Sequence, residues 1–273
     1  MGRTLSGQGG LTKPRKTAML AGMRLIHHLL VHAERPVPAF RLKLRVRSDW
    51  PAAITAQHLT ADPWCGTLRP GLDRYGNGFW HGRPASPGRR LALWVQHRVE
   101  KPVVHAVPTT QASWMLAATP LTQAGPQLID LADRAGPRPH RDRARLADLL
   151  HARLSYAASE PGTDTSAEHA LARGTGVCRD FTHVALACLR RSGCAALYVG
   201  GYLLRDGRAE PHCWLLLRSE TGWIGWDPTL DCAPGADHVP LNWGRDQADL
   251  LPCRIAHRGT AGLRVHSVVS LSA

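Results

Sequence analysis

The chain has 273 residues, and 44% of them are hydrophobic, which is enough to bury one large core or two modest ones. Every apolar run is much shorter than the ~20 residues that a membrane-spanning helix needs, so we expect no membrane partner. The apolar run at 18–23 ends at Arg24 and is too short for a secretory signal peptide. We therefore expect a cytoplasmic protein.

Charge and cysteine content narrow the functional classes further. The formal net charge is +13, but the arginines are scattered along the chain and no nucleic-acid-binding motif accompanies them, so we expect no specific nucleic acid partner. The seven cysteines form no Cys-x-x-Cys pair, and no Glu or Cys is placed to complete a metal site with His27, His28 and His32. The sequence thus predicts reduced thiols, no bound metal and no cofactor.

The N-terminal half is expected to form an extension, a β-rich domain and a linker. Residues 1–22 are polar, basic and Gly-rich, which predicts a disordered or untranslated extension. The clearest β signal within 23–118 is at 40–47, where apolar residues at even positions alternate with basic residues at odd ones. This period of two indicates one buried face and one solvated, positive face, and the intervening Pro/Gly turns favour an antiparallel β-sandwich. A proline-punctuated linker is predicted at 119–140.

From residue 141 the apolar residues recur with a helical period, so we place a second, α+β domain at 141–273. Leu146, Leu149, Leu150 and Leu154 form one stripe of a helix, and a shorter helix is predicted at 166–173. A third helix, at 178–191, is apolar almost all round, which is typical of a central buried helix. Three strands are predicted to follow it, at 195–204, 213–218 and 223–227.

Cys178 lies where a Gly-rich turn runs into this central helix, in the sequence Gly-Thr-Gly-Val-Cys-Arg-Asp-Phe at 174–181. A helix N-terminus lowers the pKa of a thiol, and its free amides can stabilise an oxyanion, so Cys178 is a candidate nucleophile. Gly176 allows a substrate backbone to approach closely, and we predict it as a substrate-binding position. The competing interpretation is that Cys178 is a buried small hydrophobic residue, which is what we expect of Cys188 in the middle of the helix.

His212 and Asp227 are predicted to share one face of a β-hairpin. If 219–222 form its loop, Arg218 pairs with Trp223, and Asp227 lies diagonally opposite His212, with Cβ atoms roughly 7 Å apart. A carboxylate at that position fixes the imidazole tautomer and stabilises its charged form. The alternatives are an ordinary core or surface histidine and an Asp-Pro turn residue.

These motifs together resemble the bacterial transglutaminase-like superfamily. The resemblance spans about 141–230 and is carried by Gly174–Phe181, Gly200-Gly201-Tyr202, His212-Cys213-Trp214 and Trp226-Asp227-Pro228-Thr229. It implies a papain-like α+β core, with a central helix packed on an antiparallel sheet, preceded by a β-rich domain. It further implies that Cys178 is the nucleophile, His212 the acid/base and Asp227 the orienting carboxylate. The family usually has Ala where Cys213 stands, and we expect this side chain to point away from the site.

The resemblance predicts an enzyme that cleaves or transfers acyl groups from a peptide or amide substrate through a thioester. Water would resolve the acyl-enzyme in a peptidase or amidase, and an amine would do so in a transglutaminase. We favour hydrolysis, and we predict Trp214 as the aromatic wall of the acyl cleft. The alternative from another class is a basic binding module that retains the fold without turnover.

Overall fold

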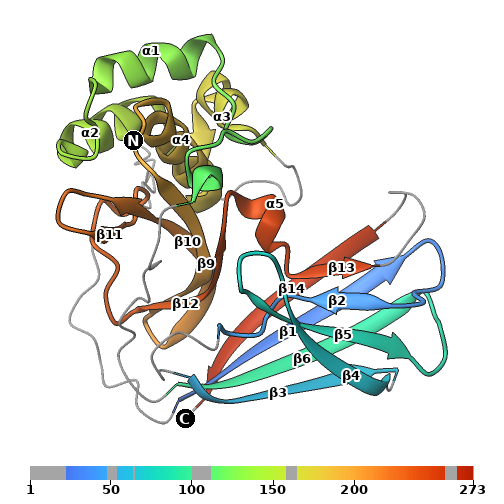
Figure 1. Ribbon diagram of the computed structural model, residues 1–273. Coiled ribbons are helices and arrows are strands. Elements are labelled where there is room, and N and C mark those ends of the chain that lie inside the picture. The colour runs from blue at the N-terminus through green and yellow to red at the C-terminus, as the bar shows by residue number, and fades with distance from the viewer. Residues whose placement is uncertain are drawn as a thin grey trace, which may run out of the picture.

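The protein consists of a helical layer, a central sheet and two further sheets, as Figure 1 shows. The computed structural model describes residues 23–47, 54–63, 65–99, 112–157, 165–255 and 263–272, so the predicted extension at 1–22 lies outside it. The mixed class of helices and antiparallel sheets agrees with the sequence-based prediction. No helix in the described ranges has the length and apolar character needed to span a membrane.

Two four-stranded antiparallel sheets form the part of the molecule drawn at the lower right of Figure 1. Their strand orders are β14-β1-β6-β3 and β13-β2-β5-β4. The strands are β1 Met23–Ala33, β2 Phe40–Leu42, β3 Ile54–Asp62, β4 Cys65–Leu72, β5 Gly78–Pro84, β6 Arg90–Val99, β13 Cys253–Ile255 and β14 Leu263–Ser272. Buried apolar side chains from both sheets join one hydrophobic core.

The C-terminal strands complete these N-terminal sheets, although the predicted boundary at residue 141 assigned them to the other domain. Strand β14 pairs with β1 from Leu263 opposite Ala33 to Ser272 opposite Arg24, and β13 pairs with β2. A strand left at a sheet edge exposes unpaired amide and carbonyl groups, and the returning strands β13 and β14 cover these edges of β2 and β1. The pairing joins residues that are distant in sequence, so no local pattern could reveal it.

The alternating segment at 40–47 differs from its prediction as a strand with one solvated basic face. Strand β2 ends at Leu42, and the side chains of Lys43 and Arg47 are buried. Lys43 forms an ion pair with Asp73, at 2.8 Å between Nζ and Oδ2. The guanidinium of Arg47 stacks 3.9 Å from the centre of the Trp243 ring and donates a hydrogen bond to the Tyr75 carbonyl. The local periodicity predicted that these two basic side chains face solvent, but hydrogen-bond acceptors from segments distant in sequence surround them.

The helical layer and the central sheet form the rest of the molecule. The helices are η1 Ser113–Met115, α1 Pro126–Ala135, α2 Arg143–Arg153, α3 Ala167–Arg173, α4 Cys178–Arg191 and α5 Gln247–Leu250. The central sheet has the order β11-β10-β9-β12, and its strands are β9 Ala196–Arg205, β10 Arg208–Arg218, β11 Trp223–Trp226 and β12 His238–Gly244. Two short strands, β7 Ser155–Tyr156 and β8 Thr175–Gly176, pair in parallel.

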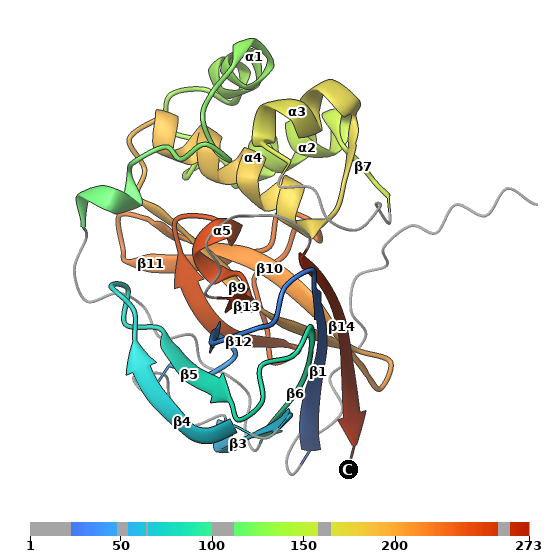
Figure 2. The same cartoon turned by 90° about the vertical axis from the view of Figure 1, so that its right-hand side faces the viewer.

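The central sheet contributes to two hydrophobic cores, one on each face. Leu197, Val199 and Trp214 join the core of the N-terminal sheets, whereas Tyr198 and Leu215 pack against the helices. Helix α4 is buried from Asp180 to Arg190, which confirms its predicted central position. Figure 2 shows α4 between the other long helices and the sheet. Helix α4 thus packs against the other helices on one side and the central sheet on the other.

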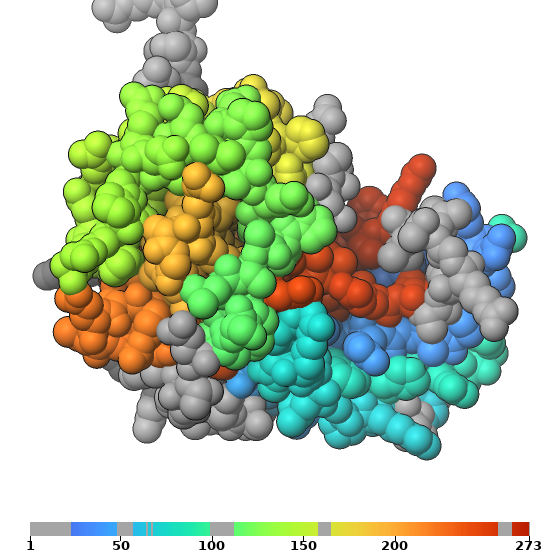
Figure 3. All heavy atoms as spheres, turned by 45° about the horizontal axis from the view of Figure 1, so that its top comes forward, coloured from blue at the N-terminus to red at the C-terminus, as the bar shows by residue number. Residues whose placement is uncertain are grey.

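The segment predicted as a linker at 119–140 takes part in this packing. Its helix α1 buries Leu128 and Leu131 in the helical core. The carboxylate of Glu168 accepts hydrogen bonds at 2.9 and 3.0 Å from two amides of the first turn of α1. Upstream, the segment around η1 (green in Figure 3) lies between the helices and the N-terminal sheets, where Met115 O accepts a hydrogen bond from Arg190.

Candidate active site

Cys178 is the first residue of helix α4. Val177 before it is extended, and the Asp180 carboxylate accepts a hydrogen bond from the Val177 amide at 3.0 Å. The amides of the first helical turn have no carbonyl partner within the helix, and the positive end of the helix dipole lies there. The sequence therefore places the half-buried Cys178 thiol where a negative charge is stabilised.

The two glycines before Cys178 shape this turn. Gly174 adopts a left-handed conformation with φ of 72° and ends α3. A Cβ at Gly176 would lie 2.7 Å from the Cβ of Asp180, which is fully buried and forms ion pairs at 3.5 Å with Arg173 and Arg179. A side chain at 176 would push Asp180 away from the start of α4. The absence of a side chain at Gly176 thus has a structural reason, and its contact with substrate stays a prediction.

His212 and Asp227 come together as the hairpin geometry predicts. Arg218 pairs with Trp223 and Leu215 with Trp226, so the register is the one expected for a loop at 219–222. Nε2 of His212 lies 2.6 Å from Oδ2 of Asp227. Because Nε2 is used in this contact, Nδ1 is the ring nitrogen left for the Cys178 thiol, and each of these two groups shifts the pKa of the other.

The electrostatics of this group favour a thiolate–imidazolium pair. A hydrogen bond from Cys213 lowers the pKa of Cys178 well below its usual value; burial opposes this shift, and the His212 ring adds to it. Burial alone would lower the pKa of His212, but its hydrogen bonds with Asp227 and Cys178 raise it to about 10. The Asp227 side chain has no exposed surface, and its contacts with two histidines hold its pKa below the usual range although burial opposes them.

Cys213 does not point away from the site, and that expectation was wrong. Its thiol lies 3.6 Å from the Thr182 hydroxyl of α4 and forms a hydrogen bond with Cys178. Burial and the neighbouring Cys178 raise the pKa of Cys213 well above its ordinary value, so it stays protonated and can donate. Alternation along β10 turns residue 213 towards the helical layer. The first turn of α4 lies against that face, which a strand pattern alone does not reveal.

His238 is part of the site, and the sequence reasoning did not find it. Its Nε2 lies 3.2 Å from Oδ2 of Asp227, and its Nδ1 lies 2.7 Å from Oδ1 of Asp237. Burial opposes protonation, but these two carboxylates raise the pKa of His238. The local signal was an Asp-His pair at the start of a strand, which is weak in a chain with 15 histidines.

His212, Asp227 and His238 have potential metal-ligand atoms within 4.8 Å of one another. Both imidazoles already share hydrogen bonds with Asp227 Oδ2. Its Oδ1 accepts hydrogen bonds from the amides of Thr229 and Leu230 at 2.9 and 3.3 Å. We therefore interpret the group as a hydrogen-bond network that orients Asp227, which has its acceptor positions filled.

Trp214 does not fit its predicted place as a cleft wall. Its side chain is fully buried, and its ring packs edge-on against His238 with centroids 5.1 Å apart. An aromatic residue that reaches solvent near the thiol is Tyr156, which is 47% exposed and pairs with Gly176 across β7 and β8. Its pKa is raised by burial and by the nearby Cys178. Tyr156 is therefore better placed than Trp214 to border an acyl-binding surface.

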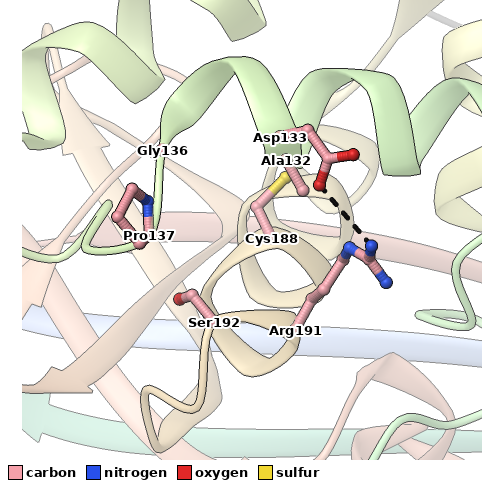
Figure 4. A pocket seen from close by; sticks show the side chains of 7 residues that line it. All are labelled: Ala132, Asp133, Gly136, Pro137, Cys188, Arg191 and Ser192. Atoms are coloured by element: carbon pink, nitrogen blue, oxygen red, sulfur yellow. Dashed lines mark hydrogen bonds and ion pairs between the residues drawn. The ribbon is translucent and has the colours of Figure 1, made fainter.

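A pocket at the other end of α4 is separate from this site. It lies between α1 and α4 beside Cys188, and Figure 4 shows the ion pair of Arg191 with Asp133 at its side. Cys188 follows Cys178 by ten residues along the helix, which corresponds to about 15 Å. This pocket therefore takes no part in the chemistry of Cys178.

Comparison with known proteins supports the assignment of the core. Residues 130–228 match the family model of the Transglutaminase-like superfamily, which confirms the resemblance predicted from the motifs for this segment. Cys178, His212 and Asp227 all lie inside the matched range. The N-terminal sheets lie outside it.

Two kinds of relatives cover more of the chain. An uncharacterized protein of Mycobacterium tuberculosis is 28% identical over 248 residues, which cover 77% of this chain and 79% of that protein. An uncharacterized protein of Mycobacterium leprae is 29% identical over 142 residues, or 49% of this chain and 50% of that protein. Among solved structures, a candidate cysteine protease from Cytophaga hutchinsonii has a TM-score of 0.71 at 18% identity, covering 92% of this chain and 90% of that chain. At this identity the likeness concerns the fold alone.

Proposed function

We propose that the protein is a cysteine-dependent enzyme that hydrolyses amide or acyl bonds of a peptide-like substrate through a thioester. The observation that carries this proposal is the 2.6 Å contact between His212 and Asp227, with the Cys178 thiol on the other side of the ring at the start of α4. The family match over 130–228 supports a cysteine-based site in this segment.

In the first half of the reaction, the Cys178 thiolate attacks the substrate carbonyl carbon. The carbonyl π electrons move to oxygen, and the free amide at the start of α4 can donate a hydrogen bond to this oxyanion. When the intermediate collapses, the carbon–nitrogen bond breaks and the His212 imidazolium gives its proton to the leaving amine. Asp227 holds the ring in place and stabilises its charged form throughout.

In the second half, neutral His212 takes a proton from water, and the resulting hydroxide attacks the thioester. The carbon–sulfur bond breaks, the acid product leaves and the thiolate–imidazolium pair is restored. An amine in place of water would give the transglutaminase reaction, which is the alternative from the same chemistry. The non-catalytic binding module is less well supported, because it gives no reason to lower the pKa of one thiol and raise that of a neighbouring histidine.

The rest of the molecule is consistent with this proposal. All seven cysteines are free thiols, which is compatible with the reducing, cytoplasmic location that we propose. We propose that the two N-terminal sheets act as a β-sandwich that supports the central sheet, since their core includes residues from β9, β10 and β12.

Alkylation with iodoacetamide at mildly acidic pH tests the proposal. Cys178 should react far faster than Cys232, which is the other half-buried thiol and provides an internal control. Mass spectrometry of the two peptides gives both rates in one sample. Incubation with peptide amides, with and without a primary amine, then separates hydrolysis from amine transfer. Equal alkylation of Cys178 and Cys232 would contradict the proposal and leave the binding module.

A further inference from the structure

The Asp227 carboxylate binds two histidines, although a Cys-His-Asp triad needs only one. Its Oδ2 lies 2.6 Å from Nε2 of His212 and 3.2 Å from Nε2 of His238. Its Oδ1 accepts the amides of Thr229 and Leu230. Because both oxygens accept hydrogen bonds, the carboxylate is held in one orientation. Among the described residues, His238 supplies the only side-chain hydrogen bond to Asp227 other than that of His212.

The His238 ring is itself held in place. It lies at the start of β12, and its side chain is 1% exposed. Nδ1 contacts Asp237 at 2.7 Å, and the edge of the Trp214 ring closes one side at 5.1 Å. Both ring nitrogens face carboxylates, and the Gly235 amide also lies 3.2 Å from Nδ1, so the ring has polar partners at both ends. A buried ring fixed at both ends cannot follow Asp227 if that carboxylate rotates, so it resists the rotation.

We propose that His238, supported by Asp237, is a positioning residue that fixes Asp227 and thereby the ring plane of His212. This inference rests on the proposed function, because the position of His212 matters only if it exchanges protons at Cys178. Without His238, one side of the buried Oδ2 loses its donor, and the carboxylate can turn about its Cβ bond. A small misalignment of the His212 ring then changes its position relative to the Cys178 thiol, and the rate of the chemical step depends on that geometry.

The test compares His238→Ala with His238→Gln, whose amide can replace the Nε2 donor without the ring. His238→Ala should lower kcat about tenfold to a hundredfold with little change in KM. It should also move the alkylation midpoint of Cys178 upward, towards that of an ordinary thiol. His238→Gln should restore most of the wild-type kcat and most of the wild-type alkylation midpoint. His97→Gln, a change of a buried histidine in the N-terminal sheets, is the matched control and should leave both measurements unchanged.

The outcomes separate the two proposals. Selective alkylation of Cys178 that persists unchanged in His238→Ala, with an unchanged midpoint, would overturn the role of His238 and leave the proposed function intact. Absence of selective alkylation in the wild-type protein would overturn both. Unfolding temperatures of the variants identify a loss of folding, which lowers the active fraction but does not move the midpoint. Stoichiometric zinc in the purified protein would also overturn the inference, since an ion would take the place of both hydrogen bonds to Oδ2.

Discussion

Two cysteines on the same helix have opposite properties. Cys178 is half-buried at the first turn of α4, and a neighbouring thiol and imidazole lower its pKa. Cys188 is 1% exposed in the helical core, and burial raises its pKa to about 12. Amino-acid type and helix are the same, so the difference comes from position: free amides, a histidine and a second thiol at one end, and apolar neighbours at the other.

The largest expected effect comes from replacing each cysteine in turn. Cys178→Ala should abolish amide hydrolysis, a loss of about 10⁴-fold or more in kcat, because no thioester can form. Cys188→Ala should keep kcat and KM near wild type while lowering the free energy of unfolding by about 1 kcal/mol, since it leaves a small cavity. Steady-state kinetics and thermal unfolding of both variants measure the contrast. Similar activity losses in the two variants would remove the distinction between the two ends of α4.

The second prediction removes the imidazole and leaves the thiol. His212→Gln should slow alkylation of Cys178 at mildly acidic pH by about a hundredfold, because the thiolate loses its cation. Wild-type hydrolysis should decline as the pH rises through about 10, where His212 loses its proton. His169→Gln, a change at the exposed side of α3, should alter neither result. An unchanged alkylation rate in His212→Gln would show that the helix N-terminus and Cys213 activate Cys178 without the imidazole.

The same variant gives a stability test with a defined sign. The folded pKa of His212 is raised from 6.5 to about 10, so its contribution to stability is fully present below pH 6.5 and is lost as the pH rises through about 10. The difference in unfolding free energy between the wild type and His212→Gln should therefore shrink over that range. Denaturant unfolding at several pH values measures this difference. A difference that grows with pH would contradict the prediction that the His212 ring is charged in the folded protein.

The sequence predicted the features of this comparison that depend on local patterns. Period and turn signals located α4, its start at Cys178 and the hairpin register that joins His212 to Asp227. The features that were missed depend on contacts between distant segments. His238 reaches Asp227 from β12, Cys213 faces α4 across a layer, and β14 returns to β1. The periodicity of a sequence shows which face of a helix or strand is buried, but it does not show which residue of another layer packs against that face.

A fourth prediction concerns the turn that places Cys178. Gly176→Ala would bring a methyl group within 2.7 Å of Asp180 Cβ, and the start of α4 must shift to accommodate it. We expect a loss of about 1–3 kcal/mol in unfolding free energy together with slower alkylation of Cys178. Gly66→Ala, where an added Cβ meets nothing within 4 Å, is the control. A stable Gly176→Ala protein with wild-type alkylation would show that this turn does not set the position of the thiol.

The smallest expected effect tests Cys213, the neighbour that most clearly separates Cys178 from Cys188. Its thiol donates a hydrogen bond to the Cys178 thiolate, and S–H is a weak donor, so Cys213→Ala should slow alkylation at mildly acidic pH by about twofold to tenfold. Cys194→Ala removes another buried thiol, one that bonds to the Arg218 carbonyl away from the site, and should leave the rate unchanged. Equal rates in both variants would assign the lowered pKa of Cys178 to His212 and the helix start alone. A selective effect of Cys213→Ala would show that a second thiol helps to activate the first.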